Sequence, residues 1–119
     1  MPFTSPRRAA AIVAFAILIA AGQAVADEEA VKIGVLGDMS GAYSDLSGAG
    51  SVEATKMAIE DFGGSVLGKP VEVLTGDHQN KADTGAAMAR KWFDTQNVDM
   101  ITDLTNSAVA LAVQALAKE

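Results

Sequence analysis

Six polar side chains of this sequence are of types that bind small molecules, and they fall into three short polar segments. Hydroxyl and amide groups donate hydrogen bonds, carboxylates accept them, and an aromatic ring can cover an apolar surface. Side chains of these types can hold a small polar ligand through such contacts. The residues are Ser40 and Tyr43 in the first segment, Asp77 and His78 in the second, and Asn106 and Ser107 in the third.

Asn106 and Ser107 have the most specific chemistry, because an apolar helical pattern begins directly after them. The free N–H groups and the dipole of a helix N-terminus favour an anion such as a carboxylate. Asn106 is also of a type that commonly caps a helix, and the two roles are compatible. We therefore expect the ligand's anionic group here. Tyr43, the only tyrosine, either covers an apolar or aromatic ligand or is an exposed aromatic of a loop.

His78, the only histidine, follows Asp77 and raises the question of a catalytic or metal site. A zinc site needs three or four ligands, and the sequence has neither a second His nor any Cys. A catalytic His needs a nucleophile to activate, and no G-x-S-x-G pattern occurs. We expect no catalytic residue, no metal and no cofactor, and we interpret His78 as lining or bordering a cleft. Asp77 and Asp38 can hold polar groups of a pocket or cap turns.

Two glycine patterns resemble nucleotide-binding motifs but lack essential parts. The segment 48–50, Gly-Ala-Gly, lacks the third glycine of the dinucleotide fingerprint and lies far beyond the preceding apolar run. The segment 63–69 fits G-x-x-x-x-G-K, but Pro70 stands where a phosphate-binding loop needs Ser or Thr. Neither segment is predicted to bind a nucleotide.

Three short runs rich in β-branched residues, each followed by a helical pattern, must position the polar segments. In the first helix the apolar positions share one face, and Gly63-Gly64 ends it. Asn80 and Asp83 are expected to cap the second helix, and residues 65–70 are expected to be a turn-rich connection. The predicted strands are 31–36, 71–75 and 98–102, and the apolar face of the first helix is Val52, Thr55, Ile59 and Phe62.

The repeated order of strand and helix predicts an α/β fold with parallel strands, since right-handed crossovers return the chain in the same direction. The polar loops 38–50, 76–81 and 103–107 then open at one edge of the sheet, where α/β folds bind ligands. The third strand would have one unpaired side, and parallel sheets rarely stop at three strands. We therefore interpret the chain as the N-terminal part of a longer protein.

Residues 1–26 have the features of a secretory signal peptide. Arg7-Arg8 precede the apolar run 9–21, and Ala24-Val25-Ala26 is a small-x-small cleavage pattern. An uncleaved membrane helix is the alternative, but the run is short for a span and acidic residues follow it. We expect general secretion, cleavage after Ala26, a periplasmic location, and no membrane insertion after processing.

The predicted mature chain, residues 27–119, is acidic. The full sequence has 9 Lys and Arg against 15 Asp and Glu, and without Arg7 and Arg8 the net charge is −8. Nucleic acids and anionic membranes need a positive surface, so neither partner is expected. The absence of Cys excludes disulfides and thiolate metal sites. A chain of this length forms one domain or part of one.

The order of motifs resembles the start of the type I periplasmic binding proteins, and most closely the branched-chain amino-acid (Leu/Ile/Val) binding proteins of ABC importers. The resemblance covers nearly all of the chain after Ala26. It rests on K-I-G-V-L, the M-S-G loop, A-I-E-D-F-G-G, L-G-K-P-V-E-V, D-H-Q-N-K-A-D and N-S-A-V-A-L. It implies two flavodoxin-like α/β lobes that close on a small ligand without catalysis, of which 27–119 is part of the first.

The resemblance also implies roles and partners. The ligand's carboxylate would meet Asn106-Ser107, the loop 40–46 would shape the pocket, and the partner would be a membrane permease. The segment 105–108, Thr-Asn-Ser-Ala, replaces the Ser-rich run of the amino-acid binders, so amides, urea and aromatic acids remain possible ligands. A ligand-sensing receptor domain of the same fold and an exported α/β enzyme remain alternatives. The missing dinucleotide fingerprint counts against the enzyme.

Overall fold

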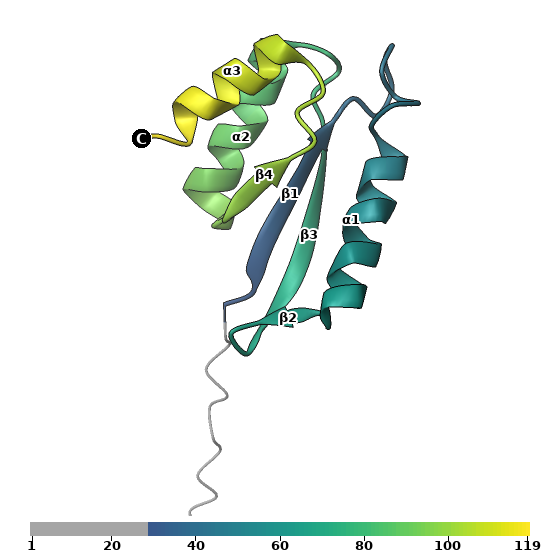
Figure 1. Cartoon of the computed structure of the whole chain (residues 1–119). Helices are drawn as coiled ribbons and strands as arrows, with labels where there is room; N and C mark the ends of the chain where they lie inside the picture. The colour runs from purple at the N-terminus through teal and green to yellow at the C-terminus, as the bar shows by residue number, and fades with distance from the viewer. Residues whose placement is uncertain (1–28) are drawn as a thin grey trace, which may run out of the picture.

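The computed structural model describes residues 29–119, which form one sheet with helices on both faces (Figure 1). The predicted signal peptide, residues 1–26, lies outside these residues. The elements in chain order are β1 (Val31–Gly37), α1 (Ala49–Phe62), β2 (Ser65–Val66), β3 (Lys69–Asp77), α2 (Ala82–Gln96), β4 (Met100–Thr102) and α3 (Ser107–Leu116).

The sheet has the strand order β2-β3-β1-β4, with β1 in the interior. β1 runs parallel to β3 from the pair Val31–Val71 to the pair Gly37–Asp77, and parallel to β4 on its other side. The predicted α/β fold with parallel strands is thus confirmed. Within residues 29–119, β4 has β1 as its only partner, as expected for the third predicted strand.

Residues 65–70, expected to be a turn-rich connection, contain the turn and also a strand that was not predicted, β2, together with the start of β3. Ser65 pairs with Pro70 and Val66 with Lys69 in an antiparallel hairpin. The two residues between the strands, Leu67 and Gly68, have φ of 51° and 79°. Positive φ at both central positions is what a two-residue hairpin turn of type I′ requires, and its twist matches that of the strands.

Three predicted boundaries also need correction. β3 is longer than residues 71–75, because its pairing with β1 continues to Asp77. β4 is shorter than residues 98–102, since the N–H of Val98 bonds to the carbonyl of Trp92 instead of entering the ladder. The N-cap of α2 is Lys81, and its side chain forms no capping hydrogen bond within the described residues. Asn80 does not cap α2, because its φ of 57° directs the chain through a left-handed turn before the helix starts.

The main core lies between the sheet and the pair α2 and α3, while α1 covers the opposite face (Figure 1). Trp92 of α2 is 5% exposed and lies against the strands. A Cβ atom on Gly34 would collide with its indole ring, and one on Gly76 would lie 2.9 Å from the ring. The two glycines therefore make room for the largest side chain of the core, which also contains Leu36, Ala89, Val98, Val109 and Val113.

The residues between α1 and the sheet are less buried than those between the sheet and the pair α2 and α3. Val52, Thr55 and Ile59 are half-buried, which confirms the apolar face predicted for α1, but Phe62 on the same face is 70% exposed. No α1 residue is fully buried within the described chain.

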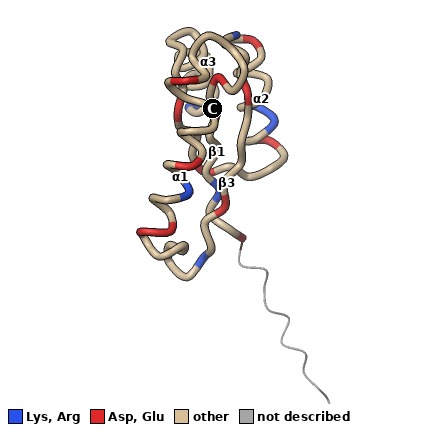
Figure 2. The backbone as a smooth tube through the Cα atoms, turned by 90° about the vertical axis from the view of Figure 1, so that its right-hand side faces the viewer, with Lys and Arg blue, Asp and Glu red and all other residues tan. Residues whose placement is uncertain are grey.

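Figure 2 shows Lys and Arg at scattered positions along the tube rather than on one face.

Candidate functional site

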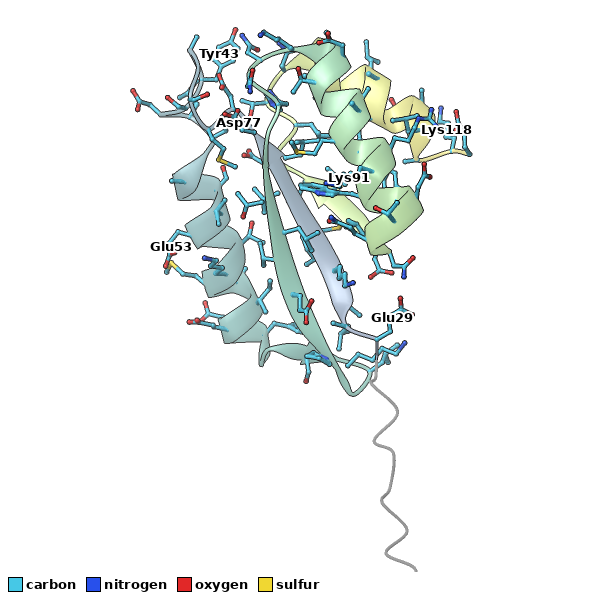
Figure 3. The ribbon with its side chains drawn as sticks, turned by 180° about the vertical axis from the view of Figure 1, so that it is seen from behind. Glu29, Tyr43, Glu53, Asp77, Lys91 and Lys118 are labelled. Atoms are coloured by element: carbon cyan, nitrogen blue, oxygen red, sulfur yellow. The ribbon has the colours of Figure 1, made fainter. Side chains whose placement is uncertain are left out.

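The loops that follow β1, β3 and β4 lie at the same end of the molecule, as the parallel strands require (Figure 1). Tyr43 and Asp77 both lie at this end, whereas Glu29 lies at the other (Figure 3). This arrangement brings together three polar segments that are far apart in the sequence. We call the carboxyl ends of these strands and the three loops the loop edge.

The first loop, residues 38–48, folds around the carboxylate of Asp38, which is completely buried. Its Oδ1 accepts the N–H of Gly41 at 2.7 Å, and its Oδ2 accepts the N–H of Tyr43 at 2.9 Å. The N–H of Asp38 donates to Oγ of Ser47 at 3.1 Å. Asp38 therefore caps a turn, which is one of the two roles that the sequence left open.

Two apolar side chains of this loop are exposed. Tyr43 is 39% exposed and Leu46 is 77% exposed. A ligand or a second protein surface at the loop edge would therefore meet apolar groups from the first loop. Leu46 is not among the six candidate residues chosen from the sequence, although it lies in the segment 40–46 that the resemblance assigned to the pocket wall.

Asp77, at the end of β3, connects the first loop to the second through hydrogen bonds. Its Oδ2 accepts the hydroxyl of Ser40 at 2.7 Å, and its Oδ1 accepts the N–H groups of Met39 at 3.0 Å and Gln79 at 2.8 Å. The Ser40 hydroxyl, with the two N–H groups, lowers the pKa of Asp77 below its ordinary value of 3.8, and desolvation opposes the shift. The structure thus brings Ser40 and Asp77 together, and their polar groups bind each other.

His78 has no exposed surface. Its backbone N–H donates to the carbonyl of Gly37 at 2.9 Å. Its ring atom Nδ1 accepts the backbone N–H of Asn80 at 2.9 Å. Because Nδ1 accepts, the proton of the neutral imidazole is on Nε2. Nε2 is buried and has no hydrogen-bond partner among the described residues. His78 therefore lies beneath the loop edge and not on its surface.

Asn106 caps α3, as the sequence predicted. Its Oδ1 accepts the N–H groups of Ala108 at 2.8 Å and Val109 at 3.1 Å, and its Nδ2 donates to Oδ1 of Asn80. Ser107 follows at the first position of the helix and is exposed. Neither its N–H nor its hydroxyl forms a hydrogen bond within the described part of the chain. Ser107 is the residue of this helix start whose donors are free for a ligand.

Asp103 and Asn80 are two features of the loop edge that sequence reasoning missed. Asp103 follows β4 with φ of 65°, and its Oδ2 is buried without a hydrogen-bond partner among residues 29–119. This atom lies beside Gly37, since a Cβ there would be 2.6 Å away. An aspartate directly after a strand was a usable signal for Asp103. For the contact of Asn80 with Asn106 the sequence contains no signal.

Within residues 29–119, no group of three or more His, Cys, Asp or Glu side chains lies close enough together to hold a metal ion. Among the same residues, no helix has the length and apolar character needed to cross a membrane.

Comparison with known proteins gives one family match and several similar structures. A family model described as periplasmic binding protein matches residues 30–119. No curated protein sequence matches the chain at a significant level. A periplasmic binding protein from Burkholderia mallei is similar, with 53% identity and a TM-score of 0.72 over 75% of this chain and 24% of that one.

Two further solved structures are similar at lower identity. The leucine-binding protein LivK from Thermotoga maritima has 31% identity and a TM-score of 0.65, over 73% of this chain and 24% of that one. A solute-binding protein of an ABC transporter from Rhodopseudomonas palustris, solved with 3,4-dihydroxybenzoic acid, has 27% identity and a TM-score of 0.67, over 76% and 24%. The chain thus spans about a quarter of the length of the structures that it matches.

Proposed function

Since the chain belongs to the periplasmic binding protein family, we propose that residues 27–119 form part of the N-terminal ligand-binding lobe of an ABC importer's substrate-binding protein. Proteins of this family bind solutes, and the described chain has the corresponding α/β architecture. The proposed partners are a small-molecule ligand and the membrane permease that receives it. In the proposed role, the protein captures its ligand and performs no reaction on it.

The observation that carries the proposal is the free helix start at Ser107. Its N–H and hydroxyl lie at the loop edge, next to the positive end of the α3 dipole, where an anion is favoured. Leucine, named for the LivK structure, and 3,4-dihydroxybenzoic acid, bound in the R. palustris protein, share a carboxylate. We therefore propose a ligand with a carboxylate, which is either a branched-chain or other amino acid or an aromatic acid. A related amide is the third class of ligand in this proposal.

The other candidate residues have distinct proposed roles. Tyr43, together with Leu46, forms an apolar wall that selects among carboxylate ligands, because both side chains are exposed at the loop edge. Asn106 orients the helix start and has a second Nδ2 hydrogen for the ligand. Ser40 and Asp77 bind each other and so shape the pocket indirectly.

Replacing Ser107 by alanine in the complete exported protein should weaken binding of L-leucine and of 3,4-dihydroxybenzoate by similar factors. A hydrogen bond to a charged group contributes about 1.5–3 kcal/mol, which corresponds to roughly one to two decades in Kd. Isothermal titration calorimetry measures both affinities. Tyr43→Ala should instead change the ratio of the two affinities, because it alters the shape of an apolar wall.

Ser65→Ala is a matched control for Ser107→Ala, since Ser65 is an exposed serine of β2 at the end of the sheet opposite the loop edge. It should leave both affinities unchanged. If Ser107→Ala binds both acids as tightly as the wild type, the carboxylate does not lie on α3 and the proposed site is wrong.

The proposed route to the periplasm is secretion with removal of residues 1–26. The expected result of N-terminal sequencing of the exported protein is a start at Asp27, reading DEEAVKIG. Asp27 follows the small-x-small pattern that signal peptidase recognises. A mature protein that starts inside the apolar run 9–21, or that retains Met1, would contradict this assignment.

A further inference from the structure

We propose that His78 is a positioning residue of the loop edge: through Asn80 it holds the cap of α3, and thereby Ser107, in place for the ligand. The proposal rests on the proposed function and adds to it a residue that the ligand does not touch. Its basis is a continuous series of hydrogen bonds from the end of β3 to the start of α3, formed by His78, Asn80 and Asn106.

The first step is the backbone of the loop after β3. Gln79 and Asn80 have φ of 53° and 57°, so two consecutive residues with side chains occupy the left-handed region, which L-residues disfavour. Each of their N–H groups donates to the side chain two residues earlier. Gln79 donates to Oδ1 of Asp77 at 2.8 Å, and Asn80 donates to Nδ1 of His78 at 2.9 Å. These two acceptors hold the unusual turn.

The second step is the contact across the loop edge. The left-handed turn presents Oδ1 of Asn80 to Nδ2 of Asn106. With Nδ2 held in this way, Oδ1 of Asn106 accepts the N–H groups of Ala108 and Val109. The orientation of the cap, and hence of Ser107 beside it, thus depends on where the turn places Asn80.

The third step is the burial of His78. The side chain has no exposed surface, and its Nε2 is buried without a hydrogen-bond partner among residues 29–119. Gly85 of α2 lies against it, since a Cβ there would be 3.4 Å from Cβ of His78 and 2.6 Å from Cγ1 of Val109. A ligand at the loop edge does not meet the imidazole, because no part of it is exposed. His78 is therefore suited to fixing its neighbours and not to contacting the ligand.

The test compares His78→Leu with His78→Asn in the complete protein. Leucine fills the space of the imidazole but provides no acceptor for the N–H of Asn80. Asparagine is smaller and leaves a cavity, but its side-chain oxygen can accept that N–H, as Asn commonly does in turns. We expect His78→Leu to weaken binding of L-leucine or 3,4-dihydroxybenzoate about tenfold, and His78→Asn less than threefold. Thermal stability should follow the opposite order, with His78→Asn the less stable variant.

A purely structural role predicts that affinity follows stability, and that result would overturn the proposal. Asn80→Gly is a second variant, because glycine accepts the positive φ and removes only the link to Asn106. It should weaken binding about as much as His78→Leu. Unchanged affinity in both His78→Leu and Asn80→Gly would also overturn the proposal.

Amide hydrogen exchange without ligand separates this proposal from the proposed function. The N–H of Asn80 should exchange faster in His78→Leu than in the wild type, and at a rate close to the wild type in His78→Asn. Equal exchange rates in all three proteins would overturn the positioning role. Exchange that follows the expected order in a wild type that binds neither acid would support the positioning of the loop and count against the proposed function.

Discussion

Trp92→Ala should lower the free energy of unfolding by about 3–5 kcal/mol, the usual cost of truncating a buried Trp. The indole ring is 5% exposed and lies over Gly34 and Gly76, which have no side chains to move into the space that it leaves. Whole domains have stabilities of only about 5–15 kcal/mol. The variant should therefore unfold at a much lower urea concentration than the wild type.

Lys91→Ala is the matched control for this prediction. Lys91 is the preceding residue of α2 and is exposed (Figure 3), and alanine is favourable in a helix, so the change should be within about 0.5 kcal/mol. Equilibrium unfolding in urea, followed by circular dichroism, measures both variants. Equal midpoints for Trp92→Ala and Lys91→Ala would mean that the indole ring is not in the core.

Asp38→Asn should destabilise the protein by about 3 kcal/mol and weaken ligand binding at the same time. The carboxylate is fully buried, and its two oxygens accept N–H groups from Gly41 and Tyr43. An asparagine has one acceptor oxygen, so its NH₂ group would face one of these N–H donors. Losing a charge-assisted hydrogen bond and placing an NH₂ group against an N–H donor each cost roughly 1–3 kcal/mol.

The loss of affinity follows from the position of the same loop. Residues 38–48 are held around Asp38, and the exposed side chains of Tyr43 and Leu46 belong to this loop. If the loop loses its shape, the apolar wall that these two side chains are proposed to form is displaced. Asp45→Asn is the control, since Asp45 is an exposed aspartate of the same loop. Thermal unfolding and calorimetric titration of both variants with L-leucine and 3,4-dihydroxybenzoate test the prediction. An Asp38→Asn variant as stable as Asp45→Asn would show that Asp38 does not organise the loop.

Local patterns in the sequence were sufficient to predict several elements correctly. The apolar run at 31–36 and the helical period that follows it predicted β1 and α1, because the apolar pattern and the backbone period are properties of neighbouring residues. Asn106 was predicted as the cap of α3, since a cap bonds to N–H groups only two and three residues away. The parallel direction of the strands followed from the handedness of the crossovers.

The sequence alone also placed the three polar loops at one edge, because parallel strands leave no other arrangement. It did not determine which side chains at that edge bind each other. Ser40 and Asp77 are separated by 37 residues, and Asn80 and Asn106 by 26. Such pairs depend on the register of the strands and on how closely the helices pack, and both are decided by the whole core.

His78 illustrates this division. As the only histidine, beside an aspartate in a polar loop, it was predicted to line or border a cleft. The tertiary structure buries it completely and uses its Nδ1 to hold the turn at Asn80. Gly85 allows this packing, since a Cβ there would lie 2.6 Å from Cγ1 of Val109 and 3.4 Å from Cβ of His78. The sequence thus determined the elements and the edge that they share, while only the packing of α2 and α3 on the sheet decided which polar residues are buried beneath that edge.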